Sequence, residues 1–109
     1  SEIIINHIDT GRCMYYRITH ATVRPGMYDE AMTTMESLRE SIGNIEGLIT
    51  SRLIRISETE VVGVAAYESK EHLEASQTEF TELMSNMAPY MAAPPSVSFG
   101  EQVLSFNGE

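Results

Sequence analysis

The sequence predicts a single α+β domain of the ferredoxin-like βαββαβ type, in which a four-stranded antiparallel sheet carries two helices on one face. Three observations predict this fold. Four segments are rich in β-branched and aromatic residues, two segments carry apolar residues at helical spacing, and turn-forming residues separate the six. The 109 residues leave room for one such domain and not for two.

The first half of the pattern is a strand followed by a helix. The strand is expected over residues 14–23, and Arg24-Pro25-Gly26 closes it because proline forces the preceding residue out of helical dihedral angles. Apolar residues then recur at spacings of three and four from Tyr28 to Ile42, which indicates an amphipathic helix. Gly43-Asn44 is expected to end this helix in the left-handed conformation.

The second half begins with a hairpin. Residues 47–56 and 61–67 are its expected strands, joined by a polar turn. Ser69 is a favourable N-cap for a second helix, which should end before Pro89. Residues 97–106 are expected to form the last strand, which completes the βαββαβ order.

The composition is that of an ordinary globular protein, with 42% apolar and 21% charged residues, so disorder is not expected. Seven basic residues against 16 acidic ones give a formal net charge of −9, and the Lys and Arg residues are scattered singly. A surface this negative repels phosphate backbones and anionic lipid heads. We therefore expect neither nucleic acid nor a membrane among the partners.

Residues 1–12 are expected to form an N-terminal extension because they end in residues of turn composition, and residues 13–109 to form the domain. The opening residues lack the basic leader and long apolar run of a signal peptide. No stretch approaches the ~20 apolar residues of a membrane-spanning helix. Cys13 is the single cysteine, so no intrachain disulfide can form. The expected location is the cytoplasm.

Two helices on one face of a sheet leave the other face bare. In a soluble protein such a face usually finds a partner, and pairing two sheets face to face gives a symmetric dimer. The predicted partner is therefore a second copy of this chain.

Three pieces of the sequence resemble the antibiotic biosynthesis monooxygenase family, which is part of the dimeric α+β barrel superfamily. They are Val23-Arg24-Pro25-Gly26 at the end of the first strand, Glu46-Gly47-Leu48 at the start of the second, and the run from Tyr67 to Ser76 that leads to Phe80. The resemblance covers residues 18–106. It implies a homodimer with one pocket per subunit between the sheet and the helices.

The chain departs from that family at positions that carry chemistry. Relatives often have Trp where this chain has Tyr67, and His where it has Ser76. Haem-degrading members also use an Asn on the first strand, where this chain has Thr19. Without the histidine, haem lacks its expected axial ligand, and no two His or Cys residues have the spacing of a zinc site. No cofactor or metal is therefore expected.

Strand periodicity places Arg17 and Thr19 on one face of the first strand, and Gly63, Ala65 and Tyr67 on one face of the third. The small residues leave either a hollow capped by the Tyr67 phenol or room for close helix packing. The same periodicity places His20 on the opposite face, towards the partner subunit.

Ser76 interrupts the apolar stripe of the second helix. Its hydroxyl either bonds back to its own helix or lines a pocket. His72 lies in the first turn of that helix, and a solvent-facing position is the simplest interpretation.

The resemblance implies a cofactor-independent monooxygenase that acts on a small aromatic or quinol-like substrate. The candidate catalytic residues are Tyr67, Thr19 and Ser76, with Arg17 as an anion stabiliser. Methionines on the inner helix stripes would give a pocket adjustable apolar walls, which suit a planar hydrophobic ligand. The alternative is a non-catalytic dimeric ligand-binding or scaffold module of the same fold. A third option, isomerase or cyclase chemistry, would need His20 to reach the pocket.

Overall fold

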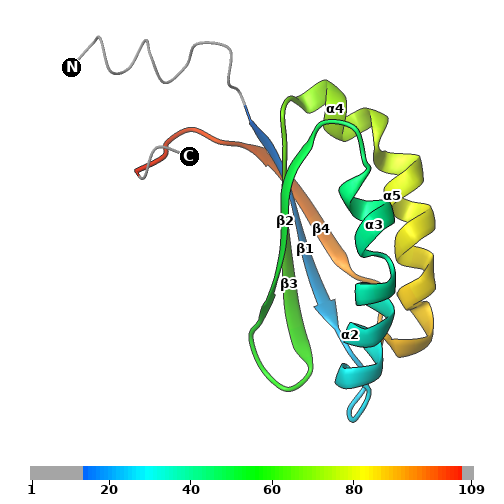
Figure 1. The fold of residues 1–109 in the computed structure, drawn as a ribbon. Coiled ribbons are helices and arrows are strands. Elements are labelled where there is room, and N and C mark those ends of the chain that lie inside the picture. Colours follow the sequence, from blue (N-terminus) through cyan, green and yellow to red (C-terminus); the bar gives the residue numbers. More distant parts are fainter. Residues whose placement is uncertain (1–13, 107–109) are drawn as a thin grey trace, which may run out of the picture.

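The computed structural model describes residues 14–106 and confirms the predicted α+β fold. The expected extension at residues 1–12 and Cys13 lie outside the described residues. The strands form one four-stranded antiparallel sheet in the order β2-β3-β1-β4, and the helices of the described part all lie on one face of it (Figure 1). In chain order the elements are β1 (Tyr15–Thr22), α2 (Tyr28–Ser37), α3 (Arg39–Gly43), β2 (Leu48–Arg55), β3 (Glu60–Tyr67), α4 (Lys70–Ala75), α5 (Gln77–Met84), the 3-10 helix η1 (Ser85–Tyr90) and β4 (Ser96–Glu101).

Each predicted helix is divided in two. The first breaks at Leu38, whose backbone N–H bonds to the Met35 carbonyl three residues back and tightens the turn. The second breaks at Ser76, whose hydroxyl donates to the Leu73 carbonyl at 2.7 Å and so competes with the helical ladder. Past Met84 the chain tightens into η1, which contains Pro89.

The expected left-handed end at Gly43-Asn44 is wrong. Asn44 has φ −90°, and the left-handed residue in this connection is Gly47, with φ +84°. The last strand is also shorter than expected. It ends at Glu101 because the residue paired with Glu101 is Tyr15, the first residue of β1.

The register of the sheet decides which side chains meet the helices. Arg17 pairs with Ala65 on one side and Phe99 on the other, and Thr19 pairs with Gly63 and Val97. Side chains that are directly opposite in an antiparallel pair point to the same face. The helix-facing side of the sheet therefore carries a row of small residues beside Arg17.

Two clusters of buried residues form the core. One lies against α2 and η1 and contains Val23, Ala31, Val61 and Met87. The other lies against α4 and contains Ile45, Ala65, Tyr67 and Leu73. Ser69 caps α4 as predicted, since its hydroxyl accepts the His72 backbone N–H at 3.1 Å.

The Gly47→Ala variant should unfold at a lower urea concentration than the wild-type protein. A side chain at a left-handed position costs about 1–2 kcal/mol, and the new Cβ would also overlap the His72 ring. Gly26→Ala is the matched control, because Gly26 has φ +82° but no atom within 4 Å of the added Cβ. Gly47→Ala should lose at least about 1 kcal/mol more than Gly26→Ala. Equal losses would show that the His72 contact relaxes at no cost.

Candidate functional site

A cavity of about 720 Å³ lies between the helix-facing side of the sheet and the helices. Apolar side chains from every layer line it, and the polar residues in its wall are few. The lining residues used below are Arg17, Thr19, Gly63, Met32, Met84 and Phe80. Its volume lies within the roughly 300–1,000 Å³ of small-molecule sites. The methionines expected on the inner helix stripes (Met32, Met35, Met84 and Met87) all contribute to its wall.

Among the described residues that line this wall, Arg17 is the charged one, and it is only 1% exposed. Its Nη1 donates to the Tyr67 hydroxyl at 2.6 Å. Its Nη2 donates to the Ser76 hydroxyl at 3.2 Å and to the Gln77 amide oxygen at 2.5 Å. One strand side chain thus joins β1 to β3, to the end of α4 and to the start of α5. We call Arg17, Tyr67, Ser76, Gln77 and Phe80 the arginine cluster.

Aromatic rings complete the cluster. The centroid of the Phe80 ring lies 3.7 Å from the guanidinium carbon and that of the Tyr67 ring lies 5.1 Å from it, both within range of a cation–π interaction. Within residues 14–106, no carboxylate oxygen lies within 4 Å of the guanidinium nitrogens. Within this part of the chain, the groups around the charge of Arg17 are therefore hydroxyl, amide and aromatic groups.

Tyr67 and Ser76 do not line the large cavity. Tyr67 is fully buried behind Arg17, and its phenol oxygen accepts from the guanidinium. Ser76 is 4% exposed, and both alternatives that the sequence left open apply in part. Its hydroxyl bonds back to Leu73 and also accepts from Arg17.

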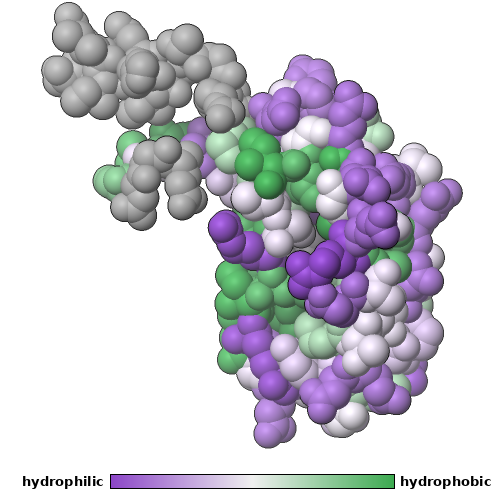
Figure 2. Space-filling view, viewed as in Figure 1, coloured by the Kyte–Doolittle hydropathy of each residue, from purple (hydrophilic) through white to green (hydrophobic). Residues whose placement is uncertain are grey.

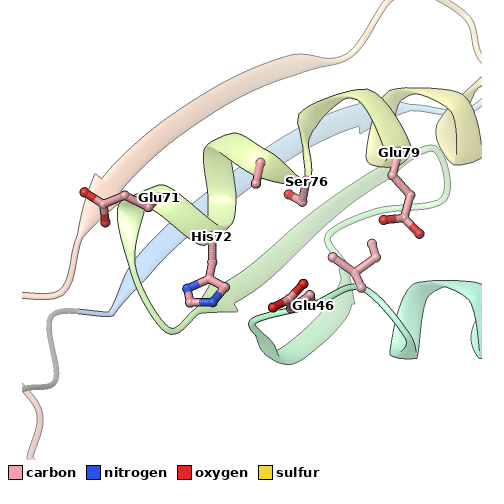
Figure 3. A pocket seen from close by; sticks show the side chains of 7 residues that line it. Glu46, Glu71, His72, Ser76 and Glu79 are labelled. Atoms are coloured by element: carbon pink, nitrogen blue, oxygen red, sulfur yellow. The ribbon is translucent and has the colours of Figure 1, made fainter.

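Ser76 also lines a second pocket of about 350 Å³, which lies between α4 and the turn before β2. Figure 3 shows Ser76 between His72 and Glu79 along the helices, with the His72 ring directed towards Glu46 on the turn before β2. Glu71 points away from this group (Figure 3). Ser76 therefore separates a polar surface pocket from the buried guanidinium.

Of the four predicted site residues, Arg17 and Thr19 line the cavity, while Tyr67 and Ser76 hold Arg17 in place. Gln77 and Phe80 were not predicted as site residues from the sequence. Gln77 directly follows the break at Ser76, and Phe80 lies three residues further along α5. The available signal in the sequence was the polar pair Ser76-Gln77, which interrupts the apolar stripe of the second helix. The partner of Gln77 is Arg17 on β1, which is 60 positions away and cannot be found from a local pattern.

The histidines of the described chain lie outside the cavity. His20 is exposed on the opposite face of the sheet, where it pairs with Val62 and Ser96. The His72 Nδ1 lies 2.8 Å from the Ser69 hydroxyl, so its ring belongs to the cap of α4. Among residues 14–106 no three His, Cys, Asp or Glu side chains gather as metal ligands do, and no helix there is long and apolar enough to cross a membrane.

Tyr67→Phe should destabilise the protein by about 2 kcal/mol, because a hydrogen bond to a charged group contributes about 1.5–3 kcal/mol. The control is Tyr90→Phe, since the half-buried Tyr90 hydroxyl accepts only a neutral bond, from Thr34 at 2.8 Å. That variant should lose about 1 kcal/mol. Urea denaturation at neutral pH measures both. A smaller loss for Tyr67→Phe than for Tyr90→Phe would contradict the importance of the arginine cluster.

No protein-family model matches the sequence, and no curated protein is similar to it in sequence. Solved structures are similar in fold. A protein from Bordetella bronchiseptica that carries the provisional name antibiotic biosynthesis monooxygenase aligns with a TM-score of 0.73 and 20% identity, over 85% of this chain and 100% of its own. NE2512 from Nitrosomonas europaea, a protein of unknown function, aligns with a TM-score of 0.76 and 13% identity, over 91% and 98%.

The third is SnoaB from Streptomyces nogalater, described as a cofactor-independent oxygenase and solved as a point mutant. It aligns with a TM-score of 0.74 and 10% identity, over 86% of this chain and 97% of its own. At these identities the similarity concerns the fold. The resemblance to antibiotic biosynthesis monooxygenases that the sequence indicates is thus confirmed at that level: the chain has the fold of these proteins.

Proposed function

We propose that the protein is a homodimeric, cofactor-independent monooxygenase of a small aromatic or quinol-like substrate. The observation that carries the proposal is the apolar cavity of about 720 Å³ with one buried cation in its wall. Such a space would hold an electron-rich ring and exclude water from it. The fold shared with SnoaB, a cofactor-independent oxygenase, supports the same reaction class.

In the proposed reaction the substrate itself reduces oxygen. A ring carbon that bears two hydrogens loses a proton, and the resulting enolate delivers electrons to O2. One oxygen atom becomes the carbonyl oxygen of the product, and the other leaves as water with the two hydrogens. Both C–H bonds and the O–O bond break, and the substrate supplies all four electrons.

The four candidate residues have two kinds of role in this proposal, contact with the substrate and positioning of Arg17. Arg17 would stabilise the enolate oxygen, and Thr19 would orient the ring from the neighbouring position on the same face of β1. Tyr67 and Ser76 would act through Arg17, whose nitrogens they hold at 2.6 Å and 3.2 Å. They are positioning residues in this proposal.

One observation favours the alternative, a non-catalytic ligand-binding module. Within the described part of the chain, the residues that line the cavity include no His, Asp, Glu or Tyr that could accept the proton. An enzyme would then depend on a substrate acidic enough to ionise with the help of Arg17 alone. A carrier needs no such group.

Oxygen consumption with anthrone, whose central ring carries the required CH2 group, separates the two functions. The wild-type protein should accelerate uptake, and Gly63→Leu should reduce the acceleration about 100-fold by displacing the ring. The added Cβ would contact Leu53 and Thr19 inside the cavity. Gly43→Leu is the control, because Gly43 is exposed at the end of α3 with nothing near its added Cβ. Ligand binding without any oxygen uptake would favour the module.

The homodimer is proposed from the bare face of the sheet. Ile18, Val62, Val64 and Ile54 share that face by strand parity. Figure 2 shows apolar surface over the strands at the left edge and mostly hydrophilic surface over the helices at the right. Ile54 on β2 and Ile56 just past its end have the same parity and are exposed by 48% and 59%. Pairing two such faces would remove apolar surface from water.

Ile54→Glu should weaken the dimer at least about 100-fold, because an unpaired carboxylate buried at an interface costs about 3 kcal/mol or more. Leu53→Glu is the control, since Leu53 points to the helix side of the same strand and is similarly exposed, at 45% against 48% for Ile54. Sedimentation equilibrium measures the dissociation constant. A monomeric wild-type protein, or equal weakening by both variants, would refute this interface.

A further inference from the structure

We infer that the cavity selects ligands that carry an ionised oxygen group on an apolar ring system, and that Arg17 is the residue that binds this group. The oxygen group is a carboxylate or an ionised phenol or enol. The inference rests on the proposed ligand-binding role of the cavity and names the ligand class. It does not depend on oxygen chemistry.

Charge balance is the first reason. Arg17 is 1% exposed, yet its acceptors are the neutral groups of Tyr67, Ser76 and Gln77. An arginine remains protonated in a protein, and a buried charge without a counter-charge is costly. No carboxylate within residues 14–106 reaches it within 4 Å. An anionic ligand in the adjoining cavity would supply the missing charge.

The geometry of the guanidinium is the second reason. Its five N–H groups make three hydrogen bonds within the described residues, so the Nε–H and one further N–H have no acceptor there. The Phe80 ring at 3.7 Å and the bond to Tyr67 restrict its movement. A held guanidinium with unused donors is preorganised for a carboxylate or oxyanion, and it loses little entropy on binding.

The contrast with the rest of the molecule is the third reason. The net charge of −9 repels anions from the surface, so a preference for an anion must come from a local site. The remainder of the wall is mostly apolar, with Met32, Met84 and Phe80 among its residues. A small hydrophilic anion would leave this wall unfilled. An anion carried on fused or substituted rings fits both parts.

The test compares two ligands of nearly equal shape, 2-naphthoate and neutral 2-naphthamide, by isothermal titration calorimetry with the full chain. The wild-type protein should bind naphthoate at least about tenfold more tightly, since hydrogen bonds to a charged group are the stronger ones. Gly63→Leu should abolish binding of both, which places them in the cavity. Equal affinities for the two ligands in the wild-type protein would overturn the inference without any variant.

Arg17→Gln should reduce the naphthoate preference to within about twofold while binding of naphthamide persists. Arg17→Lys keeps the positive charge but loses the planar set of N–H donors, so it should keep part of the preference for naphthoate. Arg39→Gln is the control, because Arg39 is exposed on α3 and pairs with Glu36. A preference that survives in Arg17→Gln, or an equal loss of both ligands, would assign Arg17 a structural role only.

Binding of 2-naphthol across a pH series separates the two kinds of anion. A naphthol that ionises at lower pH when bound identifies an ionised phenol or enol as the ligand group, and a preference for naphthoate alone identifies a carboxylate. The absence of both effects would refute the inference. Failure of oxygen uptake with charge selectivity intact would refute the monooxygenase only, whereas uptake without selectivity would refute the ligand class only.

Discussion

The buried guanidinium of Arg17 joins the two layers of this domain. It extends from the central strand β1, bonds to Tyr67 on the neighbouring strand, and reaches Ser76 and Gln77 where the second helix breaks. The guanidinium bonds to three neutral acceptors and contacts the Tyr67 and Phe80 rings. These contacts hold the second helix in position over the sheet. Small residues beside Arg17, Gly63 and Ala65, then leave the space that apolar layers would otherwise fill.

The break in the second helix follows from the same contact. Ser76 can accept from Arg17 and donate to Leu73 only if its hydroxyl lies on the inner side of the helix, where it interferes with regular hydrogen bonding. Ser76 lies between the surface pocket, which His72 and Glu46 also line, and the guanidinium of Arg17. A single serine thus interrupts the helix through its bond to Leu73 and helps to hold Arg17, which lines the cavity.

Strand parity allowed much of this arrangement to be predicted. A period of two correctly placed Arg17, Thr19 and Tyr67 on the helix side, and His20 on the other. The fold class followed from six segments of clear periodicity. Parity does not say where the end of a long side chain lies. The Tyr67 hydroxyl bonds to Arg17 and does not line the cavity, and this contact joins residues 50 positions apart in the sequence. The left-handed residue was misplaced for a related reason. Glycine occurs at both Gly43 and Gly47, and the local pattern does not show that Gly47 is the one that adopts positive φ.

The strand order also has a consequence for how the chain acquires its structure. The central strand β1 is made first, but its two neighbours, β3 and β4, come later, and Tyr16 meets Gln102 across 86 positions of sequence. Pairings of such long range slow folding, because the chain entropy is lost before the contacts form. β1 can therefore pair along both edges only after β3 and β4 have been made, and Arg17 obtains its acceptors only when Tyr67, Ser76 and Gln77 are in place. Removing the charge from water before that point would be costly, so its burial is expected late in folding.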